Sequence, residues 1–278
     1  MKIAHHGLTT MHTNCLTDVR IARDLGYDGV EFTSAKLKRF LGQGYDISVL
    51  VQACEQAGIP VTCGGALPDT ADGQVKPRDE LLAECEMLSA AAEALGCPTL
   101  QLVFFNQSQA PDQSWPEIRS GIAALVRELA DIGKAHGVQF QLEPIAWCPF
   151  HSLSQSLEVI EAAGRDNVGV VIDFWHLWSG RDTTPDEVAR LDPDLIYGIH
   201  ICDGKRPAPG EPWVETELRG YLLGDGDVPV EEWVAAVKVT GYDGVWSPET
   251  LSPVHWEYDL FDLARDAKER IEKYVGAS

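Results

Sequence analysis

Apolar and polar positions along the chain alternate between two periods. Eight short runs rich in β-branched and apolar residues are typical of buried parallel strands. They predict strands at 2–5, 29–32, 60–63, 99–104, 138–143, 168–173, 195–201 and 244–249. Between them, the spacing of amphipathic helices recurs at 16–25, 47–57, 78–95, 115–135, 153–163, 185–191, 230–239 and 260–274. This eightfold alternation predicts the α/β class and a single (β/α)8 TIM barrel.

The length of the chain and its one long connection predict the domain organisation. The 278 residues are close to the roughly 250 residues of a typical barrel, so residues 1–278 are predicted to form a single domain. The longest segment with neither period covers 202–227, the loop between the seventh strand and the seventh helix. Because connections this long are usually functional, we expect this loop to cover the C-terminal mouth of the barrel, where active sites of this fold lie.

Composition and charge exclude several classes of protein. No apolar run approaches the roughly 18 residues that a membrane span requires, and the N-terminal residues lack the features of a secretory signal, so we expect a soluble cytoplasmic protein. The net charge of −21 would repel a nucleic acid backbone. Seven cysteines without a C-x-x-C pair indicate reduced thiols.

Four polar residues end four consecutive predicted strands. They are Glu143, Asp173, His200 and Glu249. Any one of them alone is better explained as a strand cap or as a partner of a neighbouring helix, but neighbouring strand ends in a barrel bring all four to one point of the rim. Three carboxylates without a cation would repel one another, and three carboxylates with one imidazole suit Mn²⁺ best, with Mg²⁺, Co²⁺ or Zn²⁺ as alternatives. The sequence therefore predicts a catalytic divalent metal site.

The same motifs carry a resemblance to a known family. The chain resembles the xylose isomerase-like TIM barrels, which include sugar phosphate isomerases/epimerases, ketose 3-epimerases and inosose isomerases. The matching segments are Leu142-Glu143-Pro144, Ile172 to His176, His200 to Asp203 with Arg206, Arg219 to Asp227, and Gly241 to Gly244 leading to Glu249. The resemblance implies a metal-dependent isomerase or epimerase that acts on a sugar, keto-sugar or cyclitol through an ene-diolate. It also implies a homo-oligomer, either a dimer or a tetramer.

The resemblance also implies roles for individual residues. Glu143 and Glu249 correspond to metal ligands that act as acid and base on opposite faces of the substrate. His176 and Arg206 correspond to residues that contact the substrate or support the metal site. The simpler alternatives are a satisfied histidine at a helix start for His176 and a solvated loop arginine for Arg206.

One departure keeps other reactions open. Ketose 3-epimerases typically have a second glutamate six residues after the position of Glu143, and this chain has Pro149 there. A different pocket wall favours a bulkier or cyclic substrate. It also leaves open a metal-dependent lyase, either a dehydratase or an enzyme that cleaves C-glycosides by elimination. Phosphodiester cleavage and a non-catalytic sugar-binding barrel are further alternatives.

Aromatic and polar residues near the predicted mouth are candidates for the pocket. We expect at least two of six aromatic residues to line it, namely two of Trp147, Phe150, Trp175, Trp178, Trp213 and Trp256. His5 and His6 end the first strand and Glu31 lies in the second. These three either extend the pocket or have a structural role.

Overall fold

The chain folds into a closed barrel of eight parallel strands. The computed structural model describes residues 1–105 and 113–276. The barrel strands are β1 (Lys2–His6), β2 (Gly29–Thr33), β3 (Val61–Pro68), β6 (Thr99–Val103), β7 (Gln139–Glu143), β8 (Val168–Asp173), β9 (Ile196–Ile201) and β10 (Val245–Pro248). Because β1 pairs with both β2 and β10, the sheet has no free edge. The predicted fold class, an α/β (β/α)8 barrel, is confirmed.

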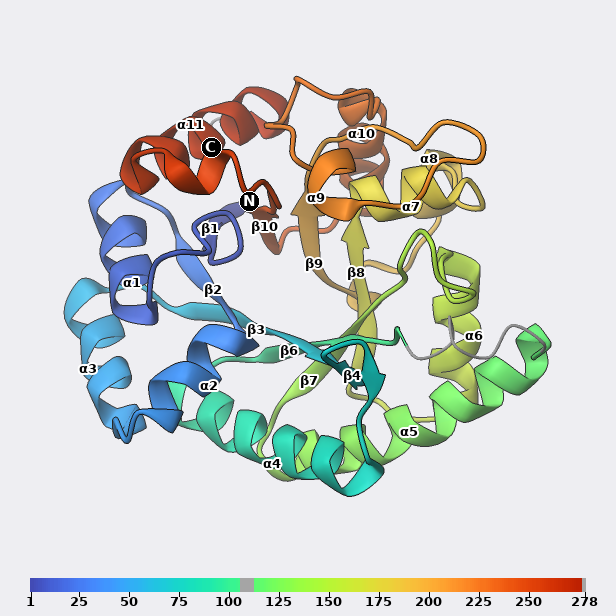
Figure 1. Cartoon of the computed structure of the whole chain (residues 1–278), viewed down its shortest axis with the longest axis horizontal. Coiled ribbons are helices and arrows are strands. Elements are labelled where there is room, and N and C mark those ends of the chain that lie inside the picture. Colours follow the sequence, from blue (N-terminus) through green and yellow to red (C-terminus); the bar gives the residue numbers. More distant parts are fainter. Residues whose placement is uncertain (106–112, 277–278) are drawn as a thin grey trace.

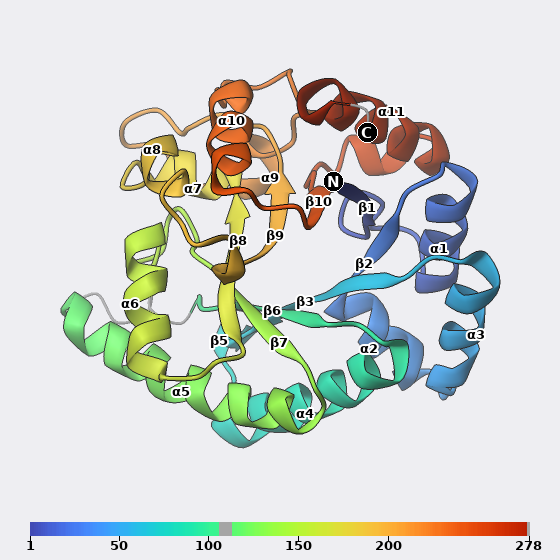
Figure 2. The same ribbon diagram turned by 180° about the vertical axis from the view of Figure 1, so that it is seen from behind.

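A ring of helices surrounds the strands (Figure 1) and is also seen from behind in Figure 2. The helices at predicted positions are α1 (Cys15–Asp24), α3 (Ile47–Ala57), α4 (Arg78–Leu95), α5 (Trp115–Ala135), α6 (Leu153–Ala163), α8 (Pro185–Val188), α10 (Val230–Thr240) and α11 (Leu260–Val275). Glycines such as Gly58 and Gly96 form the C-terminal caps of α3 and α4, where the backbone adopts the left-handed conformation that glycine allows. No helix of the described residues is long and apolar enough to cross a membrane.

Several short elements were not predicted. They are α2 (Ser34–Gly42), α7 (Phe174–Gly180), α9 (Glu215–Leu218), the hairpin of β4 (Thr70–Ala71) with β5 (Gln74–Val75), and the 3₁₀ turns η2 (Pro193–Leu195) and η3 (His255–Glu257). Helices α2 and α7 begin directly at a strand end, because Thr33 and Asp173 cap them with their side chains. Helix α9 corrects the expectation that 202–227 has no regular element.

Polar side chains fill the barrel toward its C-terminal mouth. On β7, Phe140 packs against Gly133 of α5, whereas Gln141 and Glu143 point the other way. Gln101 of β6 bonds to both of these β7 residues, so the interior is crossed by a polar network rather than an apolar layer. The apolar core lies between the sheet and the helices. All seven cysteines are buried and free, as predicted.

Candidate metal centre and pocket

The four predicted strand-end residues converge on one point. Glu143, Asp173, His200 and Glu249 are all buried, and each offers a ligand atom within 4.8 Å of the others. The strand register explains this, because Asp173 pairs with His200, and His200 pairs with Ser247, two residues before Glu249. His200 Nδ1 lies 3.0 Å from Glu249 Oε2 and 3.6 Å from Glu143 Oε1.

The donor set of this cluster fits a divalent cation. Among the described residues, neither His200 Nδ1 nor Glu143 Oε1 has a hydrogen-bond partner, although both atoms are buried. Buried polar atoms are normally satisfied, so two that face each other indicate a shared ligand. Carboxylate oxygens with one imidazole nitrogen suit divalent ions such as Mn²⁺, Mg²⁺, Co²⁺ or Zn²⁺. A cation at this point would satisfy both atoms.

The pKa values of the cluster reflect the crowded carboxylates. Burial, with the nearby charges of Glu249 and Asp173, raises the pKa of Glu143 to about 7. Burial also raises the pKa of Asp173 against the pull of Arg219. For Glu249, burial opposes ionisation, but the positive charges of Arg219 and His200 hold its pKa well below the usual range. The carboxylates therefore ionise together only when positive charge accompanies them.

Glu31 fixes the orientation of His200. His200 Nε2 lies 3.1 Å from Glu31 Oε1, and the Ser247 hydroxyl donates to Glu31 Oε2 at 2.9 Å. A carboxylate accepts only, so Nε2 donates its proton to Glu31. In the neutral imidazole the lone pair is then on Nδ1, the nitrogen that faces Glu143 and Glu249. This is the arrangement of a histidine that binds a metal, with a carboxylate behind it.

His6 is a hydrogen-bond donor beside the cluster. The Leu8 N–H donates to His6 Nδ1 at 3.1 Å, so the proton of a neutral His6 is on Nε2. That nitrogen lies 3.4 Å from Glu31 Oε1 and 3.5 Å from Glu249 Oε1. His6, Glu31 and His200 lie close enough to form a second ligand group. The proton on His6 Nε2 opposes metal binding there, so His6 and Glu31 support the first site.

Arg219, rather than Arg206, contacts the cluster. Arg219 is buried, and its Nη2 contacts the carboxylates of Asp173 and Glu249, while its Nη1 lies 3.0 Å from His176 Nε2. Arg206 instead packs over the ring of Trp178 at 3.8 Å and donates to the Trp178 carbonyl. The expected contact of Arg206 with the site is therefore not formed. Both arginines are in the long connection, where no periodic pattern predicts which one points inward.

His176 lies where the sequence placed it, directly behind the cluster. Its backbone N–H donates to Asp173 Oδ1 at 2.6 Å, and its ring nitrogen Nδ1 accepts from the Ala146 N–H at 3.3 Å. Burial and the adjacent charge of Arg219 hold the pKa of His176 well below its ordinary value. His176 is therefore neutral and available as a hydrogen-bonding group.

A cavity of about 350 Å³ opens onto the cluster. Polar residues on its wall include His6, Gln101, Glu143, His176, Glu215, Arg219 and Glu249, and small or apolar residues include Gly65, Ala66, Pro68, Val103, Phe105, Ile145 and Leu251. None of the six aromatic residues that were predicted near the mouth lines this cavity in the described part of the chain. Instead, Trp147 and Trp175 pack against the ring of His176 with centroids 5.4 and 4.9 Å away. The prediction that at least two of the six line the pocket is wrong.

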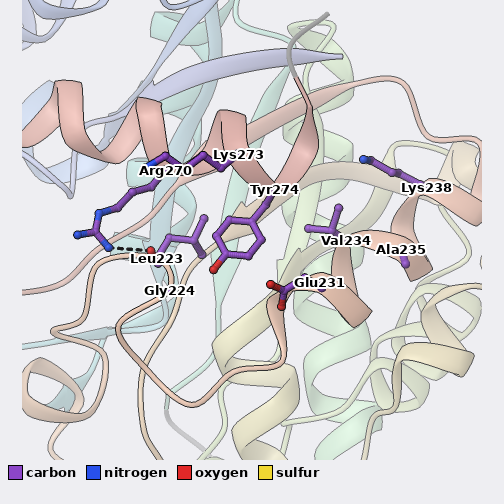
Figure 3. Close-up of a pocket in the computed structure, with 9 residues that line it drawn as sticks. All are labelled: Leu223, Gly224, Glu231, Val234, Ala235, Lys238, Arg270, Lys273 and Tyr274. Atoms are coloured by element: carbon purple, nitrogen blue, oxygen red, sulfur yellow. Dashed lines mark hydrogen bonds between the residues drawn. The ribbon is translucent and has the colours of Figure 1, made fainter.

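A second hollow lies on the outer layer of the molecule. This groove of about 540 Å³ is between α10 and α11, and Arg270 and Tyr274 on α11 point toward Leu223 and Gly224 (Figure 3). Arg270 donates to the Leu223 carbonyl at 2.9 Å. The groove contains no residue of the strand-end cluster, so the chemistry described above belongs to the smaller cavity.

Comparisons with known proteins identify the family and the fold. The model of the xylose isomerase-like TIM barrel family matches residues 19–274. An inosose isomerase of Halalkalibacterium halodurans is 25% identical over 279 residues, covering 99% of this chain and 96% of that protein. A structure of the IOLI protein with a zinc atom superposes with a TM-score of 0.88 at 23% identity, covering 99% and 98% of the two chains. A D-allulose 3-epimerase from Methylomonas sp. gives 0.74 at 18% identity, covering 99% and 98%.

Proposed function

The chain belongs to the xylose isomerase-like TIM barrel family, and we propose that it is a divalent-metal-dependent isomerase or epimerase of a sugar, keto-sugar or cyclitol. One observation carries the proposal: among the described residues, buried His200 Nδ1 and Glu143 Oε1 face each other without hydrogen-bond partners, and Glu143 lines a cavity of about 350 Å³. A volume of this order suits a small ring or open-chain sugar.

The four strand-end residues would hold the metal. The donors are His200 Nδ1 and oxygens of Glu143, Asp173 and Glu249. When bound, a divalent ion supplies Lewis-acid stabilisation of the negative charge that develops on a carbonyl oxygen. Mn²⁺ is our first choice, and the zinc atom of the similar IOLI protein supports a divalent ion without excluding Zn²⁺ itself.

Glu143 and Glu249 are proposed as the acid/base pair. Neighbouring side chains hold both carboxylates: the Gln101 amide donates to Glu143 Oε2 at 2.6 Å, and Glu249 has His6 Nε2 3.5 Å from Oε1 and Arg219 against Oε2. These contacts fix the direction of each carboxylate toward the cavity. Removal of a proton beside the carbonyl and its return to the same or the adjacent carbon would epimerise or isomerise the substrate.

Arg219 and His176 are proposed to hold the substrate oxygens. The guanidinium of Arg219 offers several N–H donors next to the cluster, and the buried neutral His176 stands beside it. A donor already aimed at the place where negative charge develops needs no reorganisation during the reaction. Arg219 thereby takes the role that the sequence predicted for Arg206.

The relatives suggest which substrates to test first. Because the chain is similar to inosose isomerases over nearly its full length, an inosose, a cyclitol ketone, is the first choice. The elimination that the sequence leaves open begins with the same proton removal and differs by the loss of a substituent. We further propose a homo-oligomer, a dimer or tetramer, as the working assembly.

A substrate panel tests the proposal. Purified protein is stripped with chelator, reloaded with Mn²⁺, and incubated with inososes, ketoses and 3-keto-glycosides while the products are followed by NMR. We expect conversion of at least one neutral polyhydroxy ketone to an isomer or epimer, loss of that conversion on chelation, and recovery with Mn²⁺. Conversion that is indifferent to the chelator, or a protein that binds no divalent ion, would contradict the proposal.

A further inference from the structure

We infer that Glu215 is a substrate-contacting residue, a carboxylate on the cavity wall that binds a hydroxyl of a neutral polyhydroxy substrate. This inference rests on the proposed function and deepens it, because it names the class of substrate. Glu215 is the first residue of α9, in the long connection between β9 and α10. Within the described residues, it is the only carboxylate on the cavity wall besides Glu143 and Glu249.

The contacts of Glu215 leave one of its oxygens available. Oε1 accepts from Arg219 Nη1 at 3.2 Å and lies 3.6 Å from His176 Nε2. Among the described residues, Oε2 has no hydrogen-bond partner. The side chain of Glu215 is 27% exposed, whereas that of Glu249, a candidate metal ligand, is 6% exposed. Glu215 is therefore more accessible to a ligand in the cavity than Glu249 is. One oxygen fixes the carboxylate and the other is free for a ligand.

The connection that positions Glu215 is held by specific bonds. Asp203, two residues after the end of β9, accepts backbone N–H bonds from Gly224 at 2.9 Å, Gly226 at 3.0 Å and Val228 at 3.1 Å. The end of α9 is fixed by a second bond, in which the Lys205 N–H donates to the Leu218 carbonyl at 2.7 Å. A side chain at Gly226 would collide with Asp203, so the two ends of the connection approach as closely as the backbone permits.

This anchoring has a consequence for α9. A helix of four residues has little stability of its own, yet it is held over the cavity by bonds at both ends of the connection. The carboxylate of Glu215 is therefore presented to the cavity by a defined backbone. That is the property required of a residue that selects a substrate.

The charges around the cavity favour a neutral substrate. In the described part of the chain, two cationic side chains other than histidines line it, and both are already paired: Arg219 with carboxylates, and Lys38 with Glu84 at 2.7 Å. A phosphate or carboxylate group would meet Glu215 without an unpaired cation to compensate it. A hydroxyl, by contrast, donates well to an ionised or partly ionised carboxylate. Burial raises the pKa of Glu215 against the pull of Arg219.

Binding of a non-reactive polyol tests the inference. The probe is myo-inositol, titrated by calorimetry into Mn²⁺-loaded wild-type protein and into Glu215→Gln, Glu215→Asp and Glu217→Gln. Glu217 is an exposed residue of the same short helix and provides the matched control. We expect Glu215→Gln to weaken binding about 10- to 100-fold, as for a lost hydrogen bond to a charged group. Glu215→Asp should recover part of this affinity, and Glu217→Gln should bind like wild type.

An anionic probe tests the charge argument in the same experiment. An inositol monophosphate should bind wild type more weakly than myo-inositol does, and Glu215→Gln should reduce the difference between the two ligands. Metal content must stay at the wild-type value in every variant, because a loss of metal would lower affinity for a reason other than the lost contact between Glu215 and the polyol.

The outcomes separate this inference from the proposed function. Wild-type affinity in Glu215→Gln, or loss of metal in both Glu215 variants, would overturn the inference alone. If wild type binds the polyol and Glu215→Gln does not, but wild type converts no ketone, the inference is supported and the proposed reaction is contradicted. A wild-type protein that binds metal and converts a ketone, but binds neither polyol, would overturn the inference and leave the proposed reaction standing.

Discussion

The contact between Glu31 and His200 provides the most specific prediction about the metal centre. In Glu31→Gln, the side chain keeps its size but can accept with only one of its two terminal atoms. His200 Nε2 and the Ser247 hydroxyl both donate to the native carboxylate, at 3.1 and 2.9 Å, so in the variant one donor faces an NH₂ group. His200 loses the charged acceptor that fixes its proton on Nε2 and its lone pair on Nδ1.

The size of the effect follows from comparable carboxylates behind metal-binding histidines. Their loss weakens metal binding about 10- to 100-fold, or about 1.4 to 2.8 kcal/mol. Because His200 and Glu31 are both buried, solvent does not replace the lost acceptor. We therefore expect a reduction of at least tenfold, with the protein still folded.

Competitive titration against a chromophoric chelator measures this change directly. Ser247→Ala is the matched control, since it removes one donor to Glu31 and leaves the contact with His200, and it should change the affinity less than threefold, that is by less than about 0.7 kcal/mol. Unchanged affinity in Glu31→Gln, with native circular dichroism, would refute the assignment of Nδ1 as the ligand atom.

Three further predictions concern the ligands, the proton balance and the fold. Asp173→Asn and His200→Ala should lose the metal in elemental analysis, whereas His176→Ala and Arg219→Lys should retain it and lose turnover; metal retained in Asp173→Asn and His200→Ala would exclude the proposed site. The pKa of His200 lies well above its ordinary value and that of Glu143 is about 7, so metal binding displaces protons from these side chains. Metal affinity should therefore increase as the pH rises through about 7, and calorimetry in buffers of different ionisation enthalpy should detect the released protons. A metal affinity that does not depend on pH would contradict this prediction. Lys36→Met should lower the free energy of unfolding by about 3 to 5 kcal/mol, because it leaves the buried Asp18 carboxylate without the ammonium 2.8 Å away. In urea titrations this deficit should shrink as the pH falls and the Asp18 carboxylate of the variant takes up a proton, and a deficit that grows would be inconsistent with a buried charge.

Much of the fold can be predicted from the sequence because buried parallel strands and amphipathic helices leave different periods. Strand β3 shows where that reasoning stops. It was predicted to end at Cys63 but continues to Pro68. Gly64 and Gly65 interrupt the apolar run, yet Gly65 belongs in the strand because a Cβ there would lie 2.6 Å from that of Gln101.

The candidate metal ligands were predictable for a related reason. A polar residue that ends a buried strand is conspicuous, and the barrel places consecutive strand ends together. The residues that support the metal ligands could not be predicted in this way, because Glu31 and Gln101 are interior strand residues whose partners depend on the register of other strands. Arg219 and Glu215 depend on the path of a connection that backbone bonds to Asp203 determine, and no periodic pattern predicts such a path.

Solvent exchange tests the central claim most directly. Mn²⁺-loaded protein is incubated in D₂O with the ketone that it converts, and deuterium at the carbon beside the carbonyl is followed by NMR for wild type, Glu143→Gln and Glu249→Gln at saturating metal. We predict incorporation by wild type and strong suppression in both variants, since each glutamate is proposed to transfer a proton. Incorporation with loss of a substituent would identify an elimination instead. Full activity in both variants without any exchange would contradict the proposed acid/base pair.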